Sequence, residues 1–224
     1  MNMFLTTKNR KAISAVLTTL IILVASVVLG TGVVLYGTSL FQTGAQSSGV
    51  STQGVHVWVN STSTPTYTWG AAEIRNSGDK ILSVDQINVR GSQIPFASWY
   101  YDNNPLRVTS TNFQAQLVYS GTDASGMMKN SNSTVLGTCT GNGANYGAAS
   151  TKFAINEFGS ASSNPILCFT QASGPISLKP GDKAIVYYQV PNGVLSTVDA
   201  GSQSSVAVYA GNVGAPQSVT VESK

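Results

Sequence analysis

No acidic or basic residue lies between Lys11 and Glu73. Within this stretch, residues 12–41 read AISAVLTTLIILVASVVLGTGVVLYGTSLF, a largely apolar run of 30 residues. As a helix this run would be about 45 Å long, which exceeds the roughly 30 Å hydrocarbon core of a bilayer. A helix that is apolar on every side needs apolar surroundings on every side. The run therefore predicts a helix that lies in lipid or among other apolar helices.

A basic cluster precedes this run. Lys8, Arg10 and Lys11 are three of the 12 basic residues, and the nine others balance nine acidic residues. The formal net charge of +3 therefore belongs to the N-terminal segment, which the positive-inside rule places on the cytoplasmic side of a membrane. The rest of the chain has no basic run of the kind that follows a phosphate backbone, so we expect no nucleic-acid partner.

The apolar run is expected to stay in the mature protein. A secretory signal has an apolar region of about 7 to 15 residues that ends in an A-x-A-like cleavage site. This run is longer, and no clear site of that kind closes it. On helix physics alone, a plain signal anchor is an alternative, because any apolar segment of sufficient length would serve as one.

Small and hydroxylated residues interrupt the apolar run. They are Ser14, Thr18, Thr19, Ser26, Gly30, Thr31, Gly32 and Gly37. Small residues let helix backbones approach closely, and Ser26 and Gly30 have the small-xxx-small spacing of packed membrane helices. The Ser and Thr hydroxyls are predicted to donate to carbonyls one turn earlier, which satisfies them without water.

The sequence Lys11-Ala12-Ile13-Ser14, with its preceding basic residues, resembles the class III signal of archaeal pilins and archaellins. In that signal a prepilin peptidase cuts after a small residue that follows a basic one. The resemblance implies a cut between Ala12 and Ile13 and a mature chain that begins ISAVL. Bacterial type IV pilins carry a glutamate at the fifth mature position, where this chain has Leu17. The likeness is therefore to the archaeal branch.

This resemblance implies a structural subunit of an extracellular archaeal type IV pilus-like filament, either an adhesion pilus or a motile archaellum. Residues 1–12 would be a cleaved leader, and residues 13–41 a helix that polymerises after leaving the archaeal cell membrane. The implied partners are copies of this chain, a prepilin peptidase and a membrane assembly platform. The helix residues expected to pack between copies are Ser14, Val16, Leu17, Leu20, Ile21, Val24, Ser26, Val27, Gly30 and Val34.

The rest of the chain is predicted to be a linker and an all-β domain. Residues 42–54 read QTGAQSSGVSTQG, which indicates a flexible connector. From residue 55 to 224 the apolar period becomes two, as in Val55, Val57 and Val59. Further strand-like runs cover residues 67–75, 81–89, 113–119, 152–158, 166–170, 184–190, 205–209 and 218–222. Short strands separated by turn residues favour an immunoglobulin-like sandwich.

Two stretches of this region, EIRNSGDKILSVDQINVRG and LKPGDKAIVYY, are similar to strand-turn-strand segments in the heads of archaeal secretion filaments. Between strands, residues 121–164 are rich in Gly, Ser, Thr and Asn, so we expect long surface excursions there.

The only two cysteines, Cys139 and Cys168, are expected to form a disulfide in an oxidising exterior. A bridge of this span would contribute roughly 3 kcal/mol by chain entropy. The alternative is that both are small buried hydrophobic residues. A zinc site is not expected, because one histidine and two cysteines cannot supply four ligands without carboxylates. No cofactor is expected.

Asn60 and Asn132 each begin an N-x-[ST] triplet and are candidate glycosylation sites. In a chain this rich in Ser and Thr, such triplets also arise by chance. A glycan at either residue would require an exposed loop outside the cell.

Nothing in the sequence indicates catalysis. Charged residues make up 9% of the chain, and the nine carboxylates show no paired or metal-binding spacing. His56, the only histidine, lies in an alternating strand and is interpreted as a satisfied or solvent-facing residue. In the aromatic cluster, alternation predicts that Trp99 and Tyr101 share one face and Tyr100 the other. We therefore expect a non-enzymatic protein, and the main alternative to a filament subunit is a monomeric, membrane-tethered β-sandwich that binds a solute or glycan.

Overall fold

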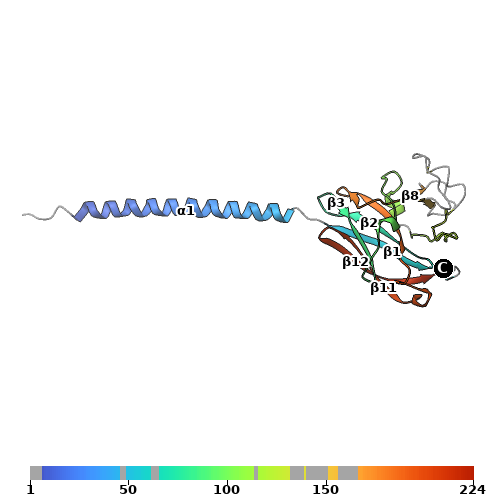
Figure 1. Ribbon diagram of the computed structural model, residues 1–224. Coiled ribbons are helices and arrows are strands. Elements are labelled where there is room, and N and C mark those ends of the chain that lie inside the picture. Colours follow the sequence, from blue (N-terminus) through green and yellow to red (C-terminus); the bar gives the residue numbers. More distant parts are fainter. Residues whose placement is uncertain are drawn as a thin grey trace, which may run out of the picture. The chain divides into compact units, whose positions relative to one another are not determined.

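The computed structural model describes residues 7–45, 49–61, 66–113, 116–131, 139, 151–155 and 166–224. The chain divides into two compact units, residues 1–47 and residues 48–224 (Figure 1). The first holds a single helix and the second holds every strand. The fold is thus an N-terminal apolar helix followed by a domain built on a large, mostly antiparallel β-sheet.

Helix α1 runs from Thr7 to Ala45, a length of 39 residues. The sequence predicted a helix over residues 13–41 only, so the structure extends it at both ends. The extension is physically reasonable because a formed helix gains one backbone hydrogen bond for each residue added. Polar residues such as Gln42 and Thr43 can therefore continue a helix even where they cannot be buried.

The prediction of a linker over residues 42–54 is wrong in its bounds. Strand β1 spans Val50–Val59, and its first residues pair with strand β2, Thr68–Asn76, from Val50 opposite Asn76 to Gln53 opposite Glu73. Backbone hydrogen bonds to β2 thus order a polar segment that reads as a connector. The pairing register shifts between Gln53 and His56. This bulge interrupts the alternation of buried and exposed residues along β1, so the regular apolar pattern of the sequence begins only at residue 55.

The described residues of the domain form twelve strands. Besides β1 and β2 they are β3 (Leu82–Val84), β4 (Gln86–Val89), β5 (Ser92–Gln93), β6 (Trp99–Asp102), β7 (Lys152–Ile155), β8 (Leu167–Gln171), β9 (Ile176–Leu178), β10 (Lys183–Val190), β11 (Gln203–Ala210) and β12 (Val213–Ser223). Ten of them form one sheet in the order β5-β4-β11-β12-β1-β2-β10-β6-β8-β7, and β3 pairs with β9. Among the described residues only the β1–β12 pair is parallel.

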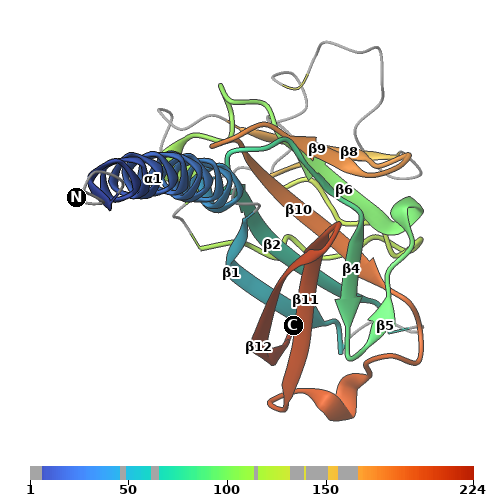
Figure 2. The ribbon, with the colours of Figure 1, turned by 90° about the vertical axis from the view of Figure 1, so that its left-hand side faces the viewer.

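Strands β2 and β10, together with residues Val57 to Val59 of β1, are buried on both faces. On one face, a first core brings β4 and β11 across β2 and β10, so that the sheet packs against itself (Figure 2). On the other face, a second core is rich in aromatic rings and is covered by parts of residues 103–131. Representative members of the second core are Trp58, Trp69, Tyr100, Phe153, Phe169 and Tyr187, with Phe113, Leu117 and Met127 over them. Because one core covers each face of β2, eight of its nine residues are buried.

Three strand predictions need correction. Residues 113–119 do not form a strand, because Phe113 ends the short helix α2 (Ser110–Phe113), and the described residues 116–119 lie outside any strand. The run over 81–89 divides at Asp85, since β3 pairs with β9 whereas β4 pairs with β11. Strands β6 and β9 were missed because each is only three or four residues long.

The predicted alternation within β6 is confirmed. Trp99 belongs to the first core and Tyr100 to the second, while Tyr101 packs against the first. The β6 side chains therefore contribute to both cores.

Candidate functional site

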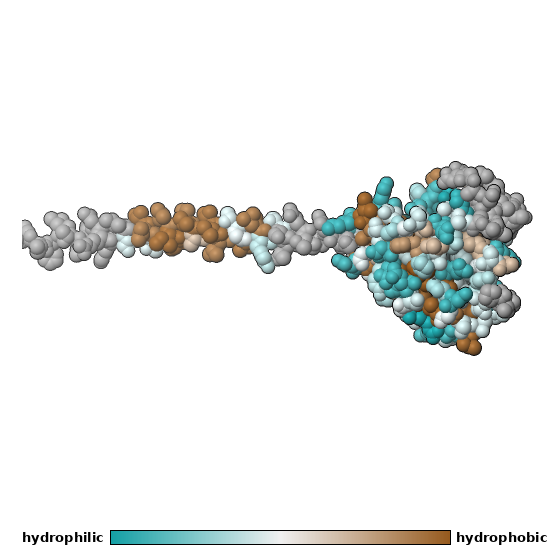
Figure 3. All heavy atoms as spheres, viewed as in Figure 1, coloured by the Kyte–Doolittle hydropathy of each residue, from teal (hydrophilic) through white to brown (hydrophobic). Residues whose placement is uncertain are grey.

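The apolar surface of α1 is the most unusual surface of the described chain. The segment Ser14–Thr38 has 25 residues and a mean hydropathy of 2.4, so it is long and apolar enough to cross a membrane. Its large apolar side chains, from Val16 to Tyr36, are between 52% and 72% exposed. Figure 3 shows a long hydrophobic stretch on the helix, followed by paler atoms and a second, smaller hydrophobic patch. In water this surface would need a covering, either of lipid or of protein.

Five hydroxyl groups of α1 donate to carbonyls of the helix itself, as predicted. Thr18 Oγ1 donates to the Ser14 carbonyl at 2.8 Å, and Ser26 Oγ donates to the Leu23 carbonyl at 2.8 Å. The same bond is made by Thr19, Thr31 and Thr38. Each of these hydroxyls can therefore enter an apolar environment without losing a hydrogen bond to water.

Side-chain size differs between two sides of α1. At about 100° per residue, the small residues Ser14, Ala15, Thr18, Thr19, Ala25, Ser26, Gly30, Gly32 and Gly37 fall on one half of the helix. The opposite half carries Val16, Leu17, Leu20, Ile21, Val24, Val27 and Val34. The residues expected to pack between copies thus lie on both halves. The separation is incomplete. Ile22, Leu29, Val33 and Tyr36 lie on the side of the small residues, and Thr31 and Thr38 lie on the opposite half.

The expected processing site lies near the start of α1. Lys11, Ala12 and Ile13 belong to the helix by their backbone, while their side chains lie outside the described part of the structure. A peptidase needs access to the backbone carbonyl of Ala12, so cleavage would require the helix to unwind locally there.

Cys139 and Cys168 are joined by a disulfide, with a Cα–Cα distance of 5.7 Å. Cys168 lies on β8, and its backbone N–H donates to the Asp102 carboxylate at 2.8 Å. Asp102 also binds Arg107 through two hydrogen bonds, with the shorter one at 2.6 Å. The disulfide therefore fixes Cys139 to β8, a strand that the buried carboxylate of Asp102 already holds in place.

The structure disfavours glycosylation at Asn60. Its side chain is 8% exposed, and Nδ2, the atom that would carry a glycan, donates to Thr122 Oγ1 at 3.0 Å. A glycan there would require this hydrogen bond to break and the side chain to leave its buried position. The triplet at Asn60 is a poor site because tertiary contacts bury it. Asn132 lies outside the described residues.

His56 is a satisfied strand residue, in agreement with its interpretation from the sequence. Its Nδ1 lies 2.9 Å from Glu222 Oε1, and its ring stacks on Trp58 with centroids 5.4 Å apart. Trp58 Nε1 donates to the other oxygen of Glu222 at 3.1 Å. Burial raises the pKa of Glu222, but hydrogen bonds from His56 and Lys224 outweigh it and lower this pKa below its ordinary value. The arrangement joins β1 to β12.

Glu73 was not singled out from the sequence. Its side chain is 2% exposed on β2, and burial raises its pKa to about 8, against a smaller lowering by a hydrogen bond from Gln53. Within the described residues its Oε1 has no hydrogen-bond partner. A single acid between apolar neighbours, in the sequence Ala71-Ala72-Glu73-Ile74, was the available signal.

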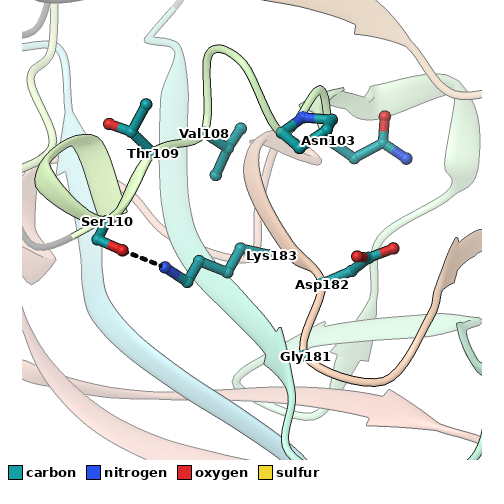
Figure 4. Close-up of a pocket in the computed structure, with 8 residues that line it drawn as sticks. Asn103, Val108, Thr109, Ser110, Gly181, Asp182 and Lys183 are labelled. Atoms are coloured by element: carbon teal, nitrogen blue, oxygen red, sulfur yellow. Dashed lines mark hydrogen bonds between the residues drawn. The ribbon is translucent and has the colours of Figure 1, made fainter.

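A small polar hollow of about 240 Å³ lies beside α2 and the turn before β10 (Figure 4). Its lining residues are Asn103, Pro105, Val108, Thr109, Ser110, Gly181, Asp182 and Lys183. Lys183 Nζ is engaged with Ser110 Oγ at 2.9 Å, and Asp182 accepts from the Lys179 N–H. Typical small-molecule pockets are larger, roughly 300 to 1,000 Å³. The charged groups of this hollow thus serve local structure. No group of three or more His, Cys, Asp or Glu residues within the described ranges could hold a metal ion.

A scan against protein-family models and a search of curated protein sequences each found no match to this chain.

Proposed function

We propose that this chain is a structural subunit of an extracellular archaeal type IV pilus-like filament, either an adhesion pilus or an archaellum. The observation that carries the proposal is the uncharged helix segment Ser14–Thr38, in which five hydroxyls are satisfied internally and the large apolar side chains are exposed. In the filament, copies of the same segment cover this surface. The β domain, which buries most of its large apolar side chains in its own cores, forms the exterior.

The energetics of the helix favour assembly from the membrane. Moving from lipid into a bundle of identical helices exchanges one apolar environment for another, so packing and assembly machinery supply the direction. Return to water is different, because α1 exposes 14 large apolar side chains. At about 1.5 to 3 kcal/mol each, their exposure would cost tens of kcal/mol as an upper estimate. Subunits should therefore not leave the filament spontaneously.

The likeness of residues 11–14 to class III signals supports the route to assembly. A prepilin peptidase cuts between Ala12 and Ile13, and an assembly platform then extracts the mature subunit from the membrane. An immunoglobulin-like type of sandwich for the head is supported by the antiparallel pairing of most strands and by the packing of β4 and β11 across β2 and β10.

A second candidate is a monomeric β domain tethered to the membrane, which binds a solute or glycan. It is favoured by the same 25-residue segment, whose length alone suffices to cross a bilayer. The two candidates differ in what they require of the helix surface. A tether needs only hydrophobicity, whereas a filament also needs a shape that packs against other copies.

Processing provides the first test. N-terminal sequencing of the native protein should find Ile13 as the first residue, and Ala12→Leu should accumulate as precursor in the membrane without filaments. Ala15→Leu, three residues beyond Ala12 in the same helix, is the matched control and should still be cleaved. Normal filaments from Ala12→Leu, or an intact N-terminus in the native protein, would count decisively against the proposal.

A second test separates the filament from the tether. Gly30→Leu adds bulk to the side of the small residues and makes the helix more apolar, so membrane insertion is preserved. Val28→Leu adds bulk about 160° around the helix from Gly30 and is the control. In a filament subunit, Gly30→Leu should reduce filament yield in electron micrographs far more than Val28→Leu does. Equal behaviour of the two variants would favour the tether.

A further inference from the structure

Glu73 lies on the face of β2 that points to the second core. Its neighbours Trp69 and Ala71 belong to that core, while Ala72 and Ile74 belong to the first. Because strand residues alternate between faces, Glu73 follows Trp69 and Ala71. A carboxylate at this position would be surrounded by apolar material, and an isolated charge there is very costly unless it is neutralised or paired.

The chain of β1 closes over this carboxyl group. Gly54 adopts a φ of +57°, and a Cβ atom added to it would lie 3.0 Å from Glu73 Cδ and Oε2. Gln53 stands directly opposite Glu73 in the strand register. The Gln53 side-chain amide in turn donates to the Phe113 carbonyl at 3.2 Å. Glu73 is therefore sealed under the bulge of β1, with Oε1 lacking a partner in the described structure.

No positive charge is bonded to Glu73 among the described residues. The flanking register positions carry Arg75 on β2, Lys183 on β10 and His56 on β1. Lys183 is bonded to the hydroxyl of Ser110, His56 is paired with a carboxylate of β12, and Arg75 is exposed. Helix α2 has no charged side chain. No cation among the described residues thus compensates the charge of an ionised Glu73, so the closed state favours the neutral acid.

The first half of β1 is the part most easily opened to water. Residues Val57 to Val59 pair with strands on both sides, β2 and β12. Residues 50–53 pair with β2, and within the described part of the chain they make two long side-chain bonds toward β12. These join Thr52 Oγ1 to the Ala215 carbonyl at 3.4 Å and Gln217 Nε2 to the Thr52 carbonyl at 3.5 Å. Fewer interactions must break to open residues 50–54 than to open the second half.

We propose that Glu73 is a proton-controlled latch for the first half of β1. The neutral acid stays sealed beneath Gly54. When its proton passes to solvent, the carboxylate is hydrated by opening residues 50–54 from β2. The opened residues join the connection between α1 and the β domain, which becomes longer and looser. The latch concerns the β domain alone and does not depend on whether the helix polymerises.

Linkage sets the direction and range of the effect. Burial raises the pKa of Glu73 from 4.5 to about 8 in the closed state, and hydration in the open state returns it to the ordinary value. The closed state therefore binds the proton more tightly. The equilibrium constant for opening is lowest below pH 4.5. It rises by about tenfold per pH unit between pH 4.5 and about pH 8, and it is constant at higher pH.

Hydrogen exchange on the full chain in detergent micelles tests this latch. Mass spectrometry of peptides covering residues 50–54, between pH 5 and pH 8, gives the opening constant after division by the intrinsic exchange rate. For the native chain this constant should rise by about tenfold per pH unit. In Glu73→Gln it should not change with pH. Glu222→Gln, which alters a carboxyl on β12, is the matched control and should keep the native response.

Two results would overturn the latch: a pH-independent opening constant in the native chain, or a rise that persists in Glu73→Gln. A second measurement applies even if Glu73→Gln folds poorly. Infrared difference spectra of the native chain should show a protonated carboxyl band at pH 6 that disappears by pH 10. If no such band is present at pH 6, Glu73 is ionised in the closed domain and the latch does not exist.

Discussion

Replacing Asp102 with alanine should destabilise the β domain by about 3 kcal/mol. The Asp102 side chain is 1% exposed, and it accepts hydrogen bonds from the Cys168 N–H at 2.8 Å and the Asn104 N–H at 3.0 Å. It also accepts two from Arg107, at 2.6 and 3.1 Å. One residue thus holds the 102–107 turn against β8.

The magnitude follows from what the substitution leaves behind. Breaking a buried ion pair costs about 3 to 5 kcal/mol when the remaining charge stays buried. Here Arg107 is 34% exposed and can be rehydrated, which favours the lower end of this range. The buried N–H of Cys168 loses its acceptor, which costs about 1 to 3 kcal/mol. Asp102→Asn keeps one acceptor oxygen and should cost about half as much as Asp102→Ala.

Tryptophan fluorescence during urea unfolding measures this effect. The three tryptophans, residues 58, 69 and 99, all lie in the β domain, so the signal excludes α1 even in the full chain in micelles. A loss of 3 kcal/mol would also lower the melting temperature by about 6 to 12 °C. The exposed residue Asp79 provides the control, since Asp79→Ala should change stability by less than about 0.5 kcal/mol. A cost below about 1 kcal/mol for Asp102→Ala would refute the reasoning, because it would mean that the carboxylate contributes no net free energy.

Three further predictions use the same unfolding assay. Gly70→Ala should destabilise the domain by about 1 to 3 kcal/mol, because its Cβ would overlap the ring of Tyr188; an unchanged midpoint would show that the ring moves freely. Cys139 and Cys168 are 29 residues apart, and replacing both with serine should lower the free energy of unfolding by about 3 kcal/mol. A reducing agent should destabilise the native chain but not this double variant. Burial raises the pKa of Glu222, but its hydrogen bonds lower it overall, so this carboxylate stabilises the domain above pH 4.5 and loses that effect as the pH falls through its folded pKa. The stability difference between the native chain and Glu222→Gln should therefore shrink in acid, and a difference that grows below pH 4 would contradict the pKa direction.

Local sequence determined the class of each large element. The uncharged apolar run required a helix in apolar surroundings, because no other structure satisfies so many backbone groups away from water. Alternation likewise located β2, β8, β10 and β11 to within about two residues. These patterns depend only on neighbours along the chain. For the same reason they predicted that the hydroxyls of Thr18 and Ser26 bond back to the helix itself.

Tertiary structure alone decided which residues are covered, since burial depends on segments far apart in the chain. The segment from Val50 to Gln53, which is polar after its first residue, forms a strand only because it pairs with β2. Asn60 looks like an exposed glycosylation site until Thr122, 62 residues away, accepts its amide N–H. Glu73 is an ordinary acid in the sequence, and the fold of β1 over it makes it a buried one whose pKa is raised. Periodicity shows which face of an element is apolar, but not which distant segment will cover it.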